Sequence, residues 1–245
     1  MKGVIINNSI QSIPLINLAI IFIPVVAVIV IMHLWARDGR EAGYGMARML
    51  AQLLIIGYFL VWLFAADNGW IIMAVLVVMV VASSWIALRT VKQHRKKQFG
   101  IALVAVALGG SVNLVLVTEG VLDLQPWYLP RYMIPLAGMI FASSMTAVSL
   151  AAERLFAELE GNPSWEDARN TALKAAMIPV VNGLFAVGLV TLPGTMTGQI
   201  LSGVDPLIAA RYQIMVMCML FGAAGLSTAI YLAMVRKQIL RDTDA

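Results

Sequence analysis

Six uncharged polar residues lie inside long apolar stretches, where they could contact a transported molecule. Such groups also hydrogen-bond neighbouring helices, an interaction that contributes about 0.6 kcal/mol on average. No Asp, Glu, Lys or Arg lies deep within these stretches, where proton- or ion-coupled carriers usually keep one. The pattern therefore favours an uncharged path or a set of helix contacts. The six residues are Gln52, Asn113, Ser143, Ser144, Thr146 and Asn182.

Two adjacent serines stand beside small residues in one of these stretches. Gly138 and Ala142 are four residues apart, so they share one face of a helix. Small residues on one face let a second helix approach closely within a membrane. We expect this helix to form a close helix–helix contact, or to line a translocation path through Ser143 and Ser144.

Methionine is the other abundant donor, with 15 in the chain. Thioether sulfur is a soft ligand suited to Cu(I), although methionine also commonly fills gaps in apolar packing. Met215 and Met219 share one helical face while Met217 points away, so this helix offers an incomplete site. Three further methionines would be better placed to bind a metal if the segments that carry them face one another. The sequence does not decide whether such a metal site exists. These three are Met139, Met145 and Met196.

Motifs of the common hydrolytic enzymes are absent from the sequence. It contains no G-x-x-x-x-G-K-[ST] phosphate-binding loop and no H-E-x-x-H zinc motif, and it has only two histidines. The one cysteine, Cys218, lies in an apolar stretch and is expected to be a packing residue. We therefore expect a chain that is not an enzyme and that holds no cofactor of its own.

The composition is that of a membrane protein. Of the 245 residues, 61% are hydrophobic and 12% are charged, whereas soluble domains have roughly 45–50% and 25%. The net charge is +4 and the pI is about 9.4. No basic face with interleaved aromatic residues accompanies this charge, so we expect no nucleic-acid partner.

Seven apolar runs approach the roughly 20 residues that a spanning helix needs. They predict an all-α membrane protein of about seven transmembrane helices, forming one transmembrane domain over residues 1–245. The runs are Ile13–Trp35, Met46–Phe64, Trp70–Leu88, Gly100–Thr118, Tyr132–Ala152, Ala175–Thr191 and Arg211–Val235.

Positive residues fix the expected orientation. With seven spans, 14 of the 17 Lys and Arg residues fall on one side, and only Lys2, Arg131 and Arg211 fall on the other. Cytoplasmic loops carry such an excess. We therefore place the N-terminus outside and the C-terminus in the cytoplasm. Four carboxylates on the outer side could attract cations or simply be solvated. They are Asp67, Glu119, Asp123 and Asp205.

The cytoplasmic connection over residues 153–174 is the most polar part of the chain. Its first part continues the preceding helix, and Gly161 is expected to break it. Asn162 and Pro163 fit an N-cap followed by proline at the first helical position, so we expect a short helix over Ser164–Lys174. The resulting helix–turn–helix is either a solvated connector or a docking element for a cytoplasmic protein.

The outer connection before the last span contains three glycines and one proline in an otherwise apolar stretch. Pro193 and Gly194 are expected to stop the sixth span. Irregular backbone at membrane depth is tolerated where protein or a water-filled cavity satisfies it. We expect Pro193–Gly203 to act as an outer gate or hinge, and Asp205 with Pro206 to cap the last helix. Within the gate we single out Pro193, Gly194, Met196, Gly198 and Gln199.

Three stretches together resemble the FetB family of ABC transporter permeases. They are Arg48-x-x-x-Gln52-Leu53-x-x-x-Gly57-Tyr58, Ile134-Pro135-x-x-Gly138-Met139, and Gly188-Leu189-Val190-x-Leu192-Pro193-Gly194-x-Met196-x-Gly198 with Gly203-x-Asp205-Pro206. The resemblance runs from about residue 45 to 235.

This resemblance implies the permease half of a transporter, working as a homodimer in the inner (plasma) membrane with a separate ATPase that holds ATP and Mg. It implies iron export, and it extends to plant relatives linked to aluminium tolerance and possibly nucleotide-sugar movement. A secondary transporter or channel without an ATPase, an ABC permease for another small solute, and a membrane anchor for an enzyme are the alternatives. The residues expected to dock the ATPase are Gly161, Asn162, Pro163, Ser164, Trp165, Glu166 and Asp167.

Overall fold

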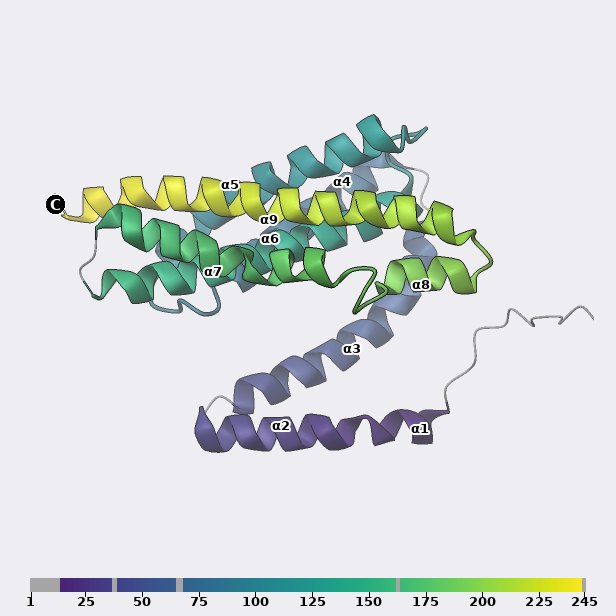
Figure 1. The fold of residues 1–245 in the computed structure, drawn as a ribbon, viewed down its shortest axis with the longest axis horizontal. Helices are drawn as coiled ribbons and strands as arrows, with labels where there is room; N and C mark the ends of the chain where they lie inside the picture. The colour runs from purple at the N-terminus through teal and green to yellow at the C-terminus, as the bar shows by residue number, and fades with distance from the viewer. Residues whose placement is uncertain (1–13, 37–38, 65–67, 162–163, 244–245) are drawn as a thin grey trace, which may run out of the picture. The chain divides into compact units, whose positions relative to one another are not determined.

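The computed structural model describes residues 14–36, 39–64, 68–161 and 164–243. All of these residues form helices or their connections, apart from one isolated β-bridge, so the all-α prediction is confirmed. The helices fall into two compact units (Figure 1). The first unit contains α1–α3 and the second contains α4–α9.

Within the first unit, a proline explains why the first apolar run is not one helix. The run forms α1 (Leu15–Ile20) and α2 (Phe22–Trp35), with Ile21 between them. Pro24 lacks the N–H that would donate to the carbonyl of Ile20, so the hydrogen-bond ladder breaks there. The helix α3 (Gly39–Phe64) begins seven residues before the expected Met46.

The second unit begins with helices close to the predicted ones. The side chain of Asn68 accepts a hydrogen bond from the Trp70 N–H at 2.9 Å and starts α4 (Gly69–Ala87). Helix α5 (Arg95–Val115) continues into a six-residue π-helix, η1 (Leu116–Val121). Helix α6 (Pro130–Leu159) extends past the expected span and ends beside Gly161, as predicted.

The expected short helix and sixth span are one helix, α7 (Trp165–Ala186), which corrects the prediction at both ends. Ser164 is the N-cap: its Oγ accepts from the Asp167 N–H at 3.2 Å. The predicted cap, Asn162, and Pro163 lie outside the described residues. The apolar part after Lys174 has 12 helical residues, which cover about 18 Å at 1.5 Å per residue, too little for a bilayer core of about 30 Å.

A hydrogen-bonded turn follows α7, where the sequence predicted five more helical residues. Gly188 adopts a φ of +82°, in the left-handed region that favours glycine. The N–H groups of Val190 and Thr191 both donate to the carbonyl of Ala186, at 2.8 and 3.1 Å. Backbone at membrane depth must be satisfied in this way, by the protein itself. The turn therefore ends the helix before Pro193 is reached.

The predicted irregular gate is largely helical, which is a second correction. Pro193 precedes α8 (Gly194–Leu201) instead of stopping a helix. Its φ of −58° is suited to a helix start. Asp205 caps α9 (Pro206–Thr243) as predicted, because its Oδ1 accepts from the Leu207 N–H at 2.8 Å. Figure 1 shows α8 beside the first turns of α9, where Thr195 Oγ1 donates to Gln213 Oε1 at 2.7 Å.

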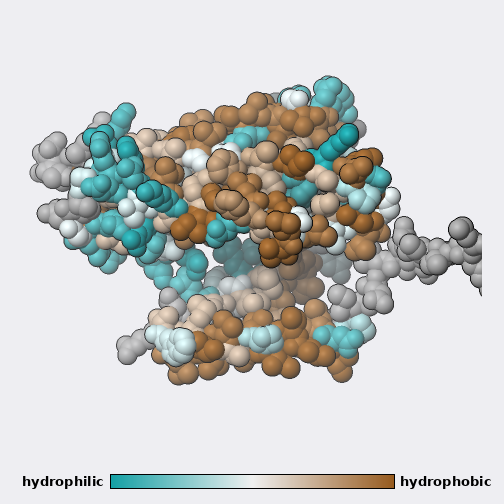
Figure 2. Space-filling view, viewed as in Figure 1, coloured by the Kyte–Doolittle hydropathy of each residue, from teal (hydrophilic) through white to brown (hydrophobic). Residues whose placement is uncertain are grey.

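Six helices of the described residues are long and apolar enough to cross a membrane, where the sequence predicted about seven spans. Helix α7 is not among them, because charged residues occupy its first turns. In the second unit, hydrophilic residues gather where α6 ends and α7 begins, and much of the remaining visible surface is apolar (Figure 2). This distribution is that of a protein whose solvent is largely lipid. The six are Ile16–Trp35, Gly39–Phe64, Gly69–Ala87, Arg95–Val121, Pro130–Leu159 and Pro206–Ile239.

The core of the second unit is the contact of α5 and α6 with α9. A Cβ added at Gly109 of α5 would lie 2.6 Å from the backbone nitrogen of Ser227 of α9. A Cβ added at Gly222 would collide with the Asn113 amide oxygen. The Ser227 hydroxyl donates to Ser144 Oγ of α6 at 3.0 Å. Glycines thus bring two backbones close enough for a buried hydroxyl pair to join the third helix.

We expect Gly109→Val to destabilise the protein by about 1–3 kcal/mol, because its new side chain would overpack the α5–α9 contact. The measurement is the thermal midpoint of the purified chain in detergent, followed by size-exclusion chromatography. Gly100→Val is the matched control on the same helix, since a Cβ there meets nothing within 4 Å. Equal midpoints for the two variants would contradict this account of the contact.

Candidate functional site

A cavity of about 390 Å³ lies between α6, α7 and α9 of the second unit. Its lining is small and apolar apart from two hydroxyls and two thioethers, and no charged side chain of the described residues lines it. We call it the α6–α7–α9 cavity. Polar and sulfur-bearing lining residues are Met139, Ser143 and Thr146 of α6, and Met217 of α9.

The two adjacent serines of α6 have different positions. Ser143 lines the cavity, and its Oγ donates to the carbonyl of Leu220 at 3.1 Å. Ser144 is fully buried, and its Oγ donates to the carbonyl of Ala223 at 3.3 Å. Both serines therefore form hydrogen bonds between α6 and α9, and only Ser143 also lines the cavity. A role for Ser143 in a translocation path stays a prediction.

The close contact does not lie at Gly138 and Ala142, where the sequence placed it. A Cβ at Gly138 would meet only the Met79 methyl group of α4, at an ordinary 3.5 Å. Ala142 is exposed and lines the cavity. The glycines that permit close approach are Gly109 and Gly222. Four-residue spacing identified a small face on α6, but the tightest contact uses other helices.

Hydrogen bonding gives the cavity a defined chemical character. The Ser143 hydroxyl hydrogen is used on Leu220, and Thr146 Oγ1 donates to the carbonyl of Ala142 at 2.9 Å. The two hydroxyl oxygens therefore present lone pairs, and the thioethers of Met139 and Met217 add soft acceptors. Such a surface favours cations and hydrogen-bond donors over anions.

The sulfur atoms of α9 divide between two cavities, as the helical spacing predicted. Met217 lines the α6–α7–α9 cavity, and Met215, Cys218 and Met219 line a second cavity beside α5. Cys218 is exposed, so it is not the buried packing residue that we expected. Met145 is half-buried and is not among the residues that line the first cavity. The described residues contain no group of three His, Cys, Asp or Glu that could hold a metal ion.

Helix α7 contributes a residue that sequence reasoning missed. Pro179 lies inside the helix and lines the cavity. Because proline cannot donate, the carbonyl of Ala175 loses its helical partner at this level. A proline within an apolar run of the sequence could have identified this position. Asn182, which we did select, is exposed and is not among the lining residues, although its neighbour Gly183 is.

The remaining predicted path residues lie elsewhere. Gln52 is exposed on α3 of the first unit, so a role for it in the path stays a prediction. Of the gate residues, Gln199 has a buried Oε1 without a hydrogen-bond partner in the part of the chain that the structure describes. All of the gate residues lie on α8 or just before it. They are Pro193, Gly194, Met196, Gly198 and Gln199.

The predicted docking residues that the structure describes follow the end of α6 or lie in the cap and first turn of α7. Gly161 is exposed and its N–H donates to the carbonyl of Glu158 at 2.9 Å. After the cap at Ser164, Trp165 is half-buried and Glu166 is exposed. Glu166 and Asp167 lie in the first turn of α7, where their negative charges interact favourably with the positive end of the helix dipole. The α6–α7 hairpin is thus a capped, charged protrusion.

The fold and its apolar surface define a multi-pass helical membrane protein. The chain belongs to the family described as Uncharacterised protein family UPF0014, which matches residues 15–165 and 162–240. This membership confirms the resemblance to FetB-type proteins that the sequence motifs carried.

Three relatives illustrate the family. The chain is 37% identical to "UPF0014 membrane protein slr1647" of Synechocystis, over 78% of this chain and 80% of the relative. It is 32% identical to "Probable iron export permease protein FetB" of Escherichia coli, over 78% of each. It is 33% identical to "Protein ALUMINUM SENSITIVE 3" of Arabidopsis thaliana, over 78% of this chain and 75% of the relative. These descriptions indicate a transporter rather than an enzyme. No solved structure matches the chain.

We predict that water reaches the α6–α7–α9 cavity, which cysteine labelling in a Cys218→Ser background can test. A charged, membrane-impermeant thiol reagent should modify Thr146→Cys, because Thr146 is exposed and lines the cavity. It should spare Val148→Cys, a fully buried position, and Leu226→Cys, an exposed apolar position on α9. A Thr146→Cys variant no more reactive than these two would show that the cavity is dry.

Proposed function

We propose that this chain is the permease subunit of an ABC transporter that exports iron or another metal species. The ATP and Mg would be held by a separate ATPase, since the chain has no phosphate-binding loop. It would work as a homodimer in the inner membrane. The description of the Escherichia coli relative as a probable iron export permease supports this substrate.

One observation carries the proposal: the charged α6–α7 hairpin joins two walls of the α6–α7–α9 cavity. A protein that pulls on Gly161 and the first turn of α7 would move both walls relative to α9. Transport by alternating access requires such relative movement around a central site. The hairpin therefore has the position that an ATPase-coupled permease needs.

The lining of the cavity is consistent with a cationic substrate and with an energy source in another protein. Its hydroxyl oxygens and thioethers are acceptors, which suit a metal ion that retains part of its hydration. No charged residue of the described chain lines it, so it lacks the ionisable group through which coupled secondary carriers usually work. An external ATPase would supply the energy instead.

We expect Gly161→Trp to abolish recovery of an ATP-hydrolysing partner. The bulky ring would occupy an exposed position at the hairpin, where a Cβ would lie 3.3 Å from the carbonyl oxygen of Glu158. Wild-type and variant chains are purified under gentle detergent, bound proteins are identified by mass spectrometry as ATPases, and ATP hydrolysis is measured. Gly120→Trp is the control, since a Cβ at Gly120 meets nothing within 4 Å. Absence of an ATPase from the wild-type preparation would reject the ABC assignment.

Filling the cavity should stop transport and leave the partner bound. Ala142 is exposed within the cavity, so leucine at this position would occupy free space. We expect Ala142→Leu to lower iron efflux from cells severely, whereas Val112→Leu on the exposed face of α5 should not. Unchanged efflux in Ala142→Leu, with normal amounts of membrane protein, would show that the path runs elsewhere.

A further inference from the structure

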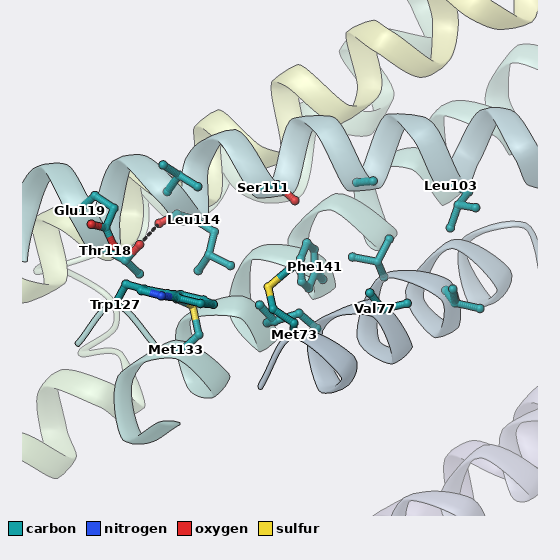
Figure 3. Close-up of a pocket in the computed structure, with 15 residues that line it drawn as sticks. Met73, Val77, Leu103, Ser111, Leu114, Thr118, Glu119, Trp127, Met133 and Phe141 are labelled. Carbon is teal, nitrogen blue, oxygen red and sulfur yellow. Dashed lines mark hydrogen bonds between the residues drawn. The ribbon is translucent and has the colours of Figure 1, made fainter. Parts of the chain in front are cut away.

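A third cavity, of about 410 Å³, lies between α4, α5, η1 and α6, and the proposed transport path does not include it. Its volume falls in the range of small-molecule sites, about 300–1,000 Å³. Most of its lining is apolar, with Leu103 and Val77 at one end (Figure 3). Met73, Met133 and Phe141 contribute thioether and aromatic surface.

The other end of this cavity carries a carboxylate. Figure 3 shows Glu119, Thr118 and Trp127 together at that end. The Thr118 hydroxyl already donates to the carbonyl of Leu114 at 3.0 Å. Glu119 has no ion pair or hydrogen bond with another residue that the structure describes. Its negative charge is therefore available to a ligand.

The backbone of the π-helix η1 determines where the Glu119 carboxylate lies. Residues Leu116–Val121 form the π-helix η1 instead of a further turn of α5. The inserted residue of a π-helix shifts the following side chains around the axis, and such insertions are frequent at functional sites. Trp127 follows in the connection to α6 and is 40% exposed. Tryptophan at a membrane boundary usually marks the headgroup level. The charged end of the cavity thus lies at the interface and its apolar end lies deeper.

We infer that this cavity binds a lipophilic organic cation, whose charge lies against Glu119 and whose apolar body fills the space beside Phe141. The charged end of the cavity lies at the membrane interface and its apolar end lies deeper. A lipophilic cation that enters from the bilayer would have the same orientation, with its charge toward water. The aromatic face of Trp127 adds cation–π attraction. The inference concerns a cavity on the other side of α6 and does not depend on the proposed transport function.

Other occupants fit less well. A hard metal ion needs about six oxygen ligands, and the cavity offers one carboxylate and the hydroxyl oxygens of Ser111 and Thr118. A phospholipid could place an acyl chain inside, but its phosphate would then approach the Glu119 carboxylate and be repelled. An organic cation satisfies the carboxylate and the apolar lining together.

Two ions of the same shape and opposite charge test the inference. Binding of tetraphenylphosphonium and of tetraphenylborate to the purified full chain in detergent is measured by equilibrium dialysis, with empty micelles subtracted. We expect Glu119→Gln to weaken phosphonium binding by at least about threefold, as for a partly exposed ion pair. Binding of the borate should be unchanged or tighter.

Two further variants separate the cavity from general surface charge. Asp123→Asn removes a carboxylate four residues away that does not line the cavity, and it should leave phosphonium binding unchanged. Ser111→Trp, which fills the cavity, should weaken both ions. Folding of each variant is checked by its elution volume and thermal midpoint.

Three results would overturn the inference. The first is equal phosphonium affinity in wild type and a folded Glu119→Gln variant. The second is an equal loss of affinity in Asp123→Asn. The third is a stoichiometric phospholipid that co-purifies with the wild-type chain and that tetraphenylphosphonium does not displace, because the occupant would then be a lipid.

Discussion

The close approach of α5 to α9 is the contact on which the rest of the second unit depends. Apolar side chains gain little by leaving lipid for a protein interior, so helix association in a bilayer depends on close packing and polar contacts. Gly109 and Gly222 provide the space, one from each helix. The hydroxyls of Ser227 and Ser144 then pair at 3.0 Å and join α6 to the same centre.

This fixed centre explains which surfaces remain open. The face of α6 that carries Ser144 packs against α9, so the residues next to Ser144 in the sequence lie on other faces of the helix. Ser143 and Ala142 line the α6–α7–α9 cavity, while Phe141 lies on the side of the cavity beside α4 and α5. Helix α7 packs with small buried residues, Ala168 and Ala172 among them. Small side chains at these positions let α7 approach its neighbours closely.

Much of this architecture could be predicted from the sequence, because apolar length is a strong signal. The Asp205 cap and the break beside Gly161 were also predicted correctly, since each depends on a few neighbouring residues. The errors concern α7 and α8. Asn162 and Ser164 are both good N-caps, and local sequence does not decide between them. The end of α7 depends on a hydrogen-bonded turn around Gly188, which apolar composition cannot reveal.

The cavities were harder to predict for a different reason. Gly138 and Ala142 share a face by spacing, but which helix meets that face depends on the whole bundle. Pro179 escaped attention because it has no polar side chain, although it removes a backbone donor beside the cavity. Glu119 was seen only as an outer carboxylate. Its place at the end of an apolar cavity follows from the π-helix, which periodicity does not predict.

Helix α6 separates two cavities of different chemistry, and this arrangement has a mechanical consequence. One side presents acceptors without charge, and the other ends at a carboxylate. Adjacent residues, Phe141 and Ala142, line the two sides, so a rotation of α6 would move a wall of each cavity at once. A molecule bound beside Phe141 would resist that rotation as directly as a load on the α6–α7 hairpin would drive it. A ligand in the cavity beside α4 and α5 and a ligand in the α6–α7–α9 cavity would therefore contact the same helix without contacting each other.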